Sequence, residues 1–374
     1  MGRFTNVYRL GIKELWALAR DPMLLVLIVY SFTLAIYTAA TAAPETLHKV
    51  PIAIVDEDDS TLSRRISSAF LPPHFFKPST ITLPAMDPGM DSGIYTFVIN
   101  IPPEFQADVI AGRSPAIQLN VDATRMSQAF TGSGSIQQII MGEVAEFVQG
   151  YRGMAALPVT VEQRMRFNPT LAPSWMTSVM EINSMITMLS VILTGAALIR
   201  EREHGTIEHL LVMPVTPAEI MLSKVWSMAL VVLLASAFSI AVVVQGWLKI
   251  PVAGSVGLFL LMVGLHLFST TSLGIFLATL SRSMPQFGLL IILVIMPLQM
   301  LSGGTTPMEN MPKLIQNIMF FAPTTHFVAA SQSILYRGAG LEVVWKDMAA
   351  IIVIGLVFYS ISLARFRKTL SQMG

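Results

Sequence analysis

The chain has 374 residues, of which 53% are hydrophobic and only 13% are charged, and its formal net charge is +1. Soluble domains carry about 25% charged residues, so this composition favours a protein that is partly covered by lipid. A net charge this close to zero gives no bulk field that would recruit nucleic acid. The absence of cysteine excludes disulfides, thiol catalysis and cysteine metal sites.

Residues 1–22 predict an amphipathic helix that lies in the cytoplasmic membrane interface. Apolar residues recur at helical spacing between Arg3 and Arg20, and charged residues occupy the other faces. Asp21 and Pro22 then start a new helix, because aspartate caps helices and proline suits the first helical position. A solvated cytoplasmic tail is the alternative interpretation of this segment.

Residues 23–43 contain no charged side chain and are numerous enough to cross a membrane once. The sequence Ala40-Thr41-Ala42 resembles a signal-peptidase site, so a cleaved signal peptide is an alternative. The apolar run and the leader before it are both longer than a signal peptide needs. We therefore expect an uncleaved first span.

Residues 44–175 regain prolines, charges and polar side chains and predict an α+β domain of normal size. Strands are expected at 50–55, 94–101, 116–121 and 159–167. Helices are expected around Arg64 and Arg65, from Pro102 to Gly112, and over 126–151. The acidic turn at 56–60 lacks the spacing and the glycine of a calcium loop, so no metal site is predicted.

Five further apolar stretches, at 176–199, 220–246, 254–280, 285–303 and 347–364, bring the predicted number of spans to six. Lysine and arginine concentrate in the short loops on the side of the N-terminus, which marks that side as cytoplasmic. Both termini, including the tail 365–374, are then cytoplasmic, and residues 44–175 are extracytoplasmic. In this topology the segment 304–346 is expected to lie on the outer side, and the whole is expected to be a multi-pass membrane protein.

The segment 200–219 predicts a short helix lying across the cytoplasmic ends of the second and third spans. Gly205 ends the second span, Thr206 can cap the short helix, and Pro214 ends it. Thr216-Pro217-Ala218-Glu219 is a capping box with proline at the first helical position, and it starts the third span. A plain loop whose caps only satisfy helix ends is the alternative.

This segment closely resembles the hallmark of ABC-2-type permeases. It has an acidic-basic run, then Gly-Thr-Ile-Glu-x-Leu-Leu, then Pro-Val-Thr, then a glutamate that opens the next helix. Shorter matches follow in the family's order over nearly the whole chain. They are 13–14 with 20–22 for the connecting helix, 51–56 and 101–105 for the multidrug-export-like branch with a long first extracytoplasmic domain, and 301–304, 307, 311–312 and 323–326 for the re-entrant segment.

The resemblance implies a six-helix fold of the type V exporter kind with an inserted α+β periplasmic domain. It also implies that the short helix after Gly205 is the coupling helix that contacts an ATP-binding subunit. The coupling residues expected on this basis are Glu201, Glu203, Gly205, Thr206, Ile207, Glu208, Leu210, Leu211, Pro214 and Glu219.

Sequence motifs for catalysis are missing from the chain. It has no Gly-x-x-x-x-Gly-Lys-Ser/Thr, no His-Glu-x-x-His and no Gly-x-Ser-x-Gly, so no catalytic residue and no bound cofactor is expected. ATP and Mg²⁺ are then expected on a partner chain, the ABC ATP-binding subunit. A second permease copy or a related chain would complete the membrane half, and a periplasmic adaptor could dock on the extracytoplasmic domain.

Polar side chains inside the predicted spans give candidates for a substrate path, because such groups usually face protein or water. They are Glu181, Asn183 and Ser184 in the second span and Gln299 in the fifth, and Met185 and Met188 of the second span would add an adaptable apolar lining. Glu181 could instead lie near the outer interface, and His266 and Gln299 could serve helix packing. Gly303, Gly304 and Pro307 interrupt the chain after the fifth span and predict an outer gate.

The resemblance implies a permease of a bacterial inner membrane that exports amphiphilic drug-like or lipid-like molecules. A secondary transporter is one alternative, but no internal repeat and few midplane charges support it. A membrane scaffold or sensor is another, and it would leave the coupling-type segment 200–219 unexplained.

Overall fold

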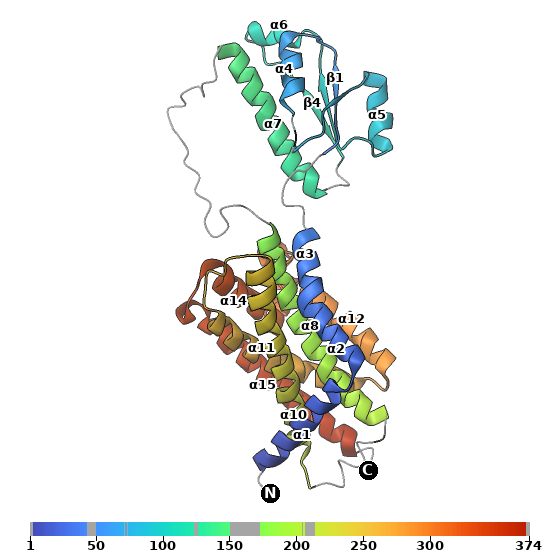
Figure 1. The fold of residues 1–374 in the computed structure, drawn as a ribbon, viewed down its shortest axis with the longest axis vertical. Coiled ribbons are helices and arrows are strands. Elements are labelled where there is room, and N and C mark those ends of the chain that lie inside the picture. Colours follow the sequence, from blue (N-terminus) through green and yellow to red (C-terminus); the bar gives the residue numbers. More distant parts are fainter. Residues whose placement is uncertain are drawn as a thin grey trace. The chain divides into compact units, whose positions relative to one another are not determined.

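The computed structural model describes residues 3–42, 50–70, 72, 74–122, 126–149, 173–203, 205 and 214–371. The chain divides into two compact units (Figure 1). One unit combines Met1–Ala43 with Met165–Gly374 and is helical; the other is Pro44–Arg164 and contains a sheet.

The described part of the helical unit combines long apolar helices with shorter ones and the amphipathic helix α1. They are α1 (Arg3–Ala19), α2 (Pro22–Tyr30), α3 (Ile36–Ala42), α8 (Pro173–Glu203), α10 (Pro217–Phe238), α11 (Val256–Leu280), α12 (Met284–Met300), α13 (Lys313–Met319), α14 (Pro323–Arg337) and α15 (Leu341–Ser371). Two π-helical segments, Ser31–Ala35 and Ser239–Trp247, join α2 to α3 and extend α10.

Five helical stretches among the described residues are long and apolar enough to cross a membrane. They are Pro22–Ala42, Ser174–Glu203, Pro217–Trp247, Val256–Leu280 and Leu341–Lys368. Helix α12 is apolar but has only 17 residues, or roughly 26 Å at 1.5 Å per residue, a little less than the hydrocarbon thickness of a bilayer. The unit is thus that of a polytopic helical membrane protein, and a sixth span stays a prediction.

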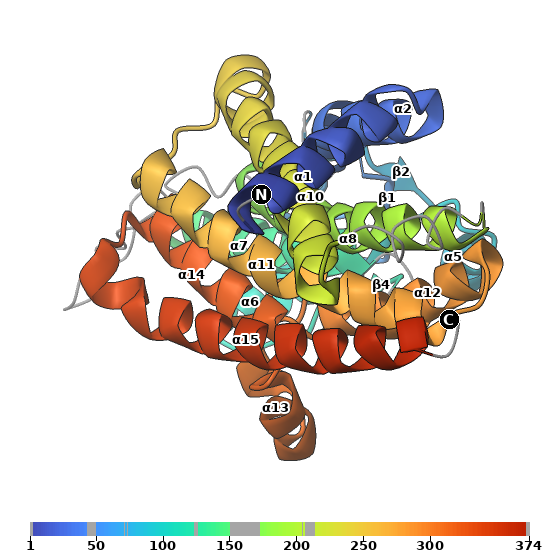
Figure 2. The ribbon, with the colours of Figure 1, turned by 90° about the horizontal axis from the view of Figure 1, so that it is seen from below.

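Helix α11 lies at the centre of the helical unit and packs against α8, α10, α14 and α15 (Figure 2). Its approach to α8 is very close at Gly274, where a Cβ would lie 2.7 Å from the carbonyl oxygen of Val191. Small residues allow such backbone contact between helices in a membrane. Helix α1 crosses α10, and the ring of Tyr8 stacks on Trp226 with 6.2 Å between centroids.

The second unit holds a four-stranded mixed sheet in the order β2-β1-β3-β4. Strand β1 (Ile52–Asp56) pairs in parallel with β2 (Ser79–Thr80) and with β3 (Phe97–Ile101), and β4 (Gln118–Val121) is antiparallel to β3. The register places Ile54 beside Ile99, and Ile99 beside Leu119.

Helices cover both faces of this sheet (Figure 1). Helices α4 (Thr61–Ala69), α6 (Phe105–Ile110) and α7 (Met126–Gln149) pack on the face that carries Ile52 and Ile54, while α5 (Leu83–Asp91) packs on the face of Ala53 and Val55. Successive side chains of a strand point to opposite faces, so β1, which is apolar from Ile52 to Val55, is buried on both.

The strands predicted at 50–55, 94–101 and 116–121 are present as β1, β3 and β4. Strand β2 and helix α5 were not predicted, because β2 has two residues and α5 contains Pro88. The strand predicted at 159–167 lies outside the described residues.

Candidate functional site

The last turn of α8 carries four consecutive charged residues, Arg200, Glu201, Arg202 and Glu203, which open the predicted coupling segment 200–219. Each of the four contacts a different part of the helical unit. We call this turn the charged hub.

Glu201 of the charged hub belongs to a group of two ammonium and two carboxylate side chains, of which Glu14, Glu201 and Lys224 are buried and Lys13 is 49% exposed. The ammonium nitrogen of Lys224 in α10 is 2.7 Å from Glu201 and 2.9 Å from Glu14 in α1. Lys13 lies 2.7 Å from the other carboxylate oxygen of Glu201. Lys224 is only 1% exposed, and a buried charge of this kind requires close partners of opposite sign. The group therefore fastens α1, α8 and α10 together.

Arg200 reaches the junction of α1 and α2. Its Nη1 atom donates to Asp21 Oδ2 at 2.9 Å. The other carboxylate oxygen of Asp21 accepts a hydrogen bond from the backbone N–H of Leu24 and so caps α2. One aspartate thus both starts the first predicted span and binds the end of the second.

Arg202 and Glu203 bind the junction of α11 and α12. Arg202 Nη1 donates to the carbonyl oxygen of Ser281 at 2.7 Å, just past the last turn of α11. The backbone N–H of Met284, the first residue of α12, donates to Glu203 Oε1 at 3.0 Å. A cation at a helix C-terminus and an anion at a helix N-terminus both complement the helix dipole.

The segment between α8 and α10 is described at its two ends. Gly205 has φ +67°, a left-handed conformation that glycine adopts at low cost just beyond a helix C-terminus. At the other end, Thr216 and Glu219 form the predicted capping box, with Pro217 in the first turn of α10. Pro214 lies in the described stretch just before it. Thr206, Ile207, Glu208, Leu210 and Leu211 lie outside the described residues.

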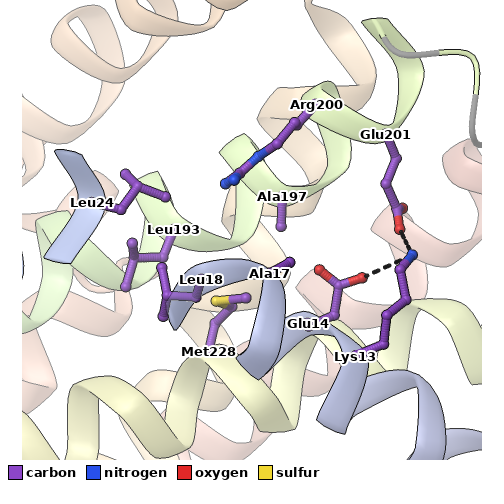
Figure 3. A pocket seen from close by; sticks show the side chains of 10 residues that line it. All are labelled: Lys13, Glu14, Ala17, Leu18, Leu24, Leu193, Ala197, Arg200, Glu201 and Met228. Atoms are coloured by element: carbon purple, nitrogen blue, oxygen red, sulfur yellow. Dashed lines mark hydrogen bonds and ion pairs between the residues drawn. The ribbon is translucent and has the colours of Figure 1, made fainter. Parts of the chain in front are cut away.

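A cavity of about 240 Å³ adjoins the buried charge group, between α1, α2, α8 and α10 (Figure 3). Lys13, Glu14, Arg200 and Glu201 line its polar part. Leu18, Leu24, Leu193, Ala197 and Met228 line its apolar part. The charged hub is therefore not packed tightly where it borders this cavity. The space leaves room for side chains of α1 and α8 to change position.

Burial and neighbouring charges shift the pKa of the two α1 residues in this group. It raises the pKa of Glu14 above the ordinary value of a glutamate, and the nearby Lys224 only partly offsets this. For Lys13, burial acts to lower the pKa, but the hydrogen bond and ion pair with Glu201 outweigh it and raise the pKa overall.

The candidates for a substrate path in α8 do not share one environment. Asn183 is buried, and its Nδ2 atom donates to Ser331 Oγ in α14 at 2.6 Å. The backbone carbonyl of Ser184 accepts a hydrogen bond from Gln299 in α12 at 2.9 Å. Both contacts are side-chain links between helices, as expected of helix packing in a membrane.

The other path candidates, Glu181, Met185 and Met188, are half-buried. His266 is buried, lies 2.9 Å from Thr187 Oγ1 through its Nε2 atom, and stacks on Phe327 with 4.0 Å between centroids. The half-buried side chains keep an accessible surface on α8, whereas His266 is enclosed by protein.

The predicted outer gate follows α12 and lies against α8. Gly303 has φ +91°, and a Cβ on Gly304 would lie 2.5 Å from the sulfur of Met180. Pro307 precedes a short 3₁₀ helix at Met308–Asn310. The backbone conformation therefore favours glycine at Gly303, whereas a larger residue at Gly304 would require the flexible side chain of Met180 to move.

Comparison with known proteins places this site in a family. Residues 22–364 match the family model described as "ABC-2 family transporter protein". The chain belongs to this family. Permeases of the ABC-2 family are membrane subunits that are not themselves ATPases and that work with ABC ATP-binding subunits.

Similar proteins carry transport names. The chain is 58% identical to "Inner membrane transport permease YhhJ" of Escherichia coli K12 over 373 residues, which covers 100% of both chains. It is 26% identical to "Probable multidrug ABC transporter permease YbhR" of the same strain over 368 residues, 98% of this chain and 99% of the relative. For "Probable multidrug ABC transporter permease YbhS" the identity is 26% over 285 residues, 70% and 72% of the two chains. These names and the apolar helices make this ABC-2 permease a multi-pass inner-membrane protein.

Sequence reasoning on this permease missed the partners of the charged hub. It used Lys13 and Glu14 in a connecting-helix resemblance, Asp21 as a helix cap and Lys224 to orient the spans, but it paired none of them with the residues 200–203. The position of Lys224 was itself a signal, since a lysine within a long apolar helix requires a carboxylate nearby.

Proposed function

We propose that this chain is the membrane-spanning subunit of an ATP-driven exporter, which moves amphiphilic drug-like or lipid-like substrates outward. ATP and Mg²⁺ bind to a separate ABC ATP-binding subunit, which hydrolyses the ATP. A second permease copy or a related chain completes the path, and a periplasmic adaptor is a further candidate partner.

The observation that carries this proposal is the charged hub. Four successive side chains at the end of α8 each contact a different partner. These partners are α10 together with α1, the junction of α1 and α2, the end of α11, and the start of α12. A displacement of the segment after Gly205 would act directly on this turn. The permease thus has a mechanical connection from the predicted coupling helix to five other helices.

The arrangement of charges supports the proposed topology. The hub, its partners and the capping box of α10 gather charged groups at one end of the helical unit, and charged groups are costly at membrane depth. We place this end at the cytoplasmic surface, with both termini there. Helix α12 is then the sixth span, and the α+β unit is the inserted periplasmic domain.

Two relatives are named "Probable multidrug ABC transporter permease". These names support the substrate class proposed for this permease. The half-buried face of α8 with Glu181, Met185 and Met188 provides a mixed polar and apolar surface for such substrates. Methionine side chains adapt to different apolar shapes. The loop at Gly303 and Gly304 then acts as the outer gate of this path.

The proposal is tested by purifying the permease from its native membranes in mild detergent and identifying co-purifying proteins by mass spectrometry. We expect an ABC ATP-binding subunit to be retained by the wild type. It should be lost from the variant Glu208→Arg with Leu211→Arg, while Lys249→Glu, in the loop after α10, should retain it. Absence of any ATPase after cross-linking would overturn the proposal.

A further inference from the structure

The α+β unit contains an apolar groove that the coupling site does not involve. The groove has a volume of about 640 Å³ and lies between α6, β4 and α7. Ligand pockets in proteins commonly have volumes of about 300–1,000 Å³. The size is therefore that of a site for one small molecule.

The groove has a buried floor and an exposed rim. Phe105 at the floor is 3% exposed, whereas Met141 at the rim is 65% exposed. Val109, Leu119 and Val144 line the space and are partly buried. Such a gradient of exposure describes a concave apolar surface rather than scattered apolar residues.

Helix α7 is apolar over a wider arc than its packing against the sheet requires. Ile136, Ile140 and Phe147 contact the core beneath the sheet. Met141 and Val148 lie on an outer stripe of the same helix and are 65% and 61% exposed. Large apolar side chains exposed beside a pocket are typical of a binding surface.

Polar groups line the groove after α6 and on α7. Arg113 is the one charged residue among the described residues that line it, and Ser114, Ser133 and Gln137 also line it. Arg113 donates from Nε and Nη2 to a single oxygen of Asp108. A guanidinium carries five N–H donors in a planar fork, so Arg113 can hold Asp108 and an anionic group together.

We propose that this groove binds a single-chain amphiphile with an anionic head group, with the chain along Phe105, Leu119 and Val144 and the head at Arg113. The apolar lining of the groove accommodates the hydrocarbon chain of the amphiphile. Arg113 selects a negative head group over a positive one. This binding goes beyond the proposed export function and does not depend on it, because it needs neither ATP nor a partner.

The absence of cysteine from the chain makes a clean test possible on the full-length permease in phosphatidylcholine nanodiscs. Met141→Cys places a thiol at the groove rim, and Gln138→Cys places one at an exposed position of α7 outside the groove. The rate of reaction with a charged maleimide is measured alone, with laurate, and with dodecyltrimethylammonium.

We expect laurate to slow the reaction of Met141→Cys severalfold and to leave Gln138→Cys unchanged. Dodecyltrimethylammonium should protect much less, and Arg113→Gln should abolish the difference between the two amphiphiles. Val144→Trp, which fills the groove, should remove the protection by laurate.

Four results would overturn the proposal. They are a Met141→Cys thiol that is unreactive without ligand, protection that is equal at both positions, protection that is equal for both head groups, and no protection at all. The first would show that another part of the protein covers the groove, and the second that the amphiphile acts on the bilayer.

Discussion

Lys224 and Glu14 are 210 positions apart in the sequence, yet Lys224 Nζ donates to Glu14 Oε1 at 2.9 Å in a buried contact. The pair joins the helix that precedes the first span to the helix that follows the coupling segment. Glu201 contacts the same ammonium group, so a displacement of the end of α8 would act on both α1 and α10.

Lys224→Met should destabilise the permease strongly. It removes one of two ammonium groups and leaves two carboxylates to share Lys13, and breaking a buried pair in this way costs about 3–5 kcal/mol. The double variant Lys224→Met with Glu14→Gln restores charge balance and should melt at a higher temperature than the single variant. The measurement is loss of the monodisperse size-exclusion peak after heating. A double variant that melts no higher than the single one would show that the charge group does not hold these helices.

Glu203→Ala should uncouple α12 from α8, because it removes the acceptor for the Met284 N–H. Glu203→Gln keeps a side-chain carbonyl oxygen and should behave much more like the wild type. In a complex purified with its ATPase, we expect Glu203→Ala to change ATP hydrolysis severalfold while the amount of bound ATPase stays the same. If Glu203→Ala and Glu203→Gln gave equal rates, the contact with Met284 would not take part in coupling.

His326 gives the permease a pH dependence of stability. Its two ring nitrogens lie 3.0 Å from Asp347 Oδ1 and 2.9 Å from the carbonyl oxygen of Phe320. Both partners are acceptors, so both nitrogens donate only when the ring is protonated. The hydrogen bond to Asp347 raises the pKa of His326 above its ordinary value of 6.5, although burial acts against it.

A raised folded-state pKa means that His326 contributes its full stabilisation below pH 6.5 and loses it as the pH rises through the folded-state value. The melting temperature should therefore fall above this pH. His326→Gln, which cannot ionise, should remove this part of the decline. If the melting temperature of His326→Gln fell with pH as steeply as that of the wild type, His326 would not be the group responsible. Asp347→Asn, measured in the same way, tests the role of the partner of His326.

The loop after α12 gives a prediction for the outer gate. Gly304→Ala should push Met180 aside, since the new Cβ would meet its sulfur at 2.5 Å, and the extra bulk should slow export. Met180→Ala combined with Gly304→Ala should restore it, because the flexible thioether is the obstacle. Uptake of an amphiphilic dye into inverted membrane vesicles with ATP measures both variants. Equal export rates in the single and double variants would show that the contact between residue 304 and Met180 does not control the gate.

Local patterns explain how much of this fold could be predicted from the sequence. The α1 helix, the uncharged run after Asp21 and the capping box at Thr216 and Glu219 each depend on a few neighbouring residues, and all three are present. The apolar run of β1 and the alternation predicted for β3 likewise depend on short segments. Strand β2 has only two residues, too few to give a periodic signal.

The charged hub could not be predicted, because its contacts join residues far apart in the chain. The pattern Arg200-Glu201-Arg202-Glu203 predicts a charged helix end, but not that Glu201 turns to α10 while Arg202 turns to α11. The separate environments of Asn183 and Ser184 have the same origin. Neighbouring residues on a helix face different partners, and only the packing of α12 and α14 decides which.

In the proposed function, the segment after Gly205 contacts an ATP-binding subunit on the cytoplasmic side. The most direct test uses the cysteine-free chain with a single Glu208→Cys change, labelled in native membranes with a thiol-reactive photo-cross-linker. Glu309→Cys, at an exposed position of the loop after α12, is the matched control. We predict a cross-link to an ATP-binding subunit from position 208 and none from position 309. A cross-link from position 309 alone, or none from position 208, would contradict the account.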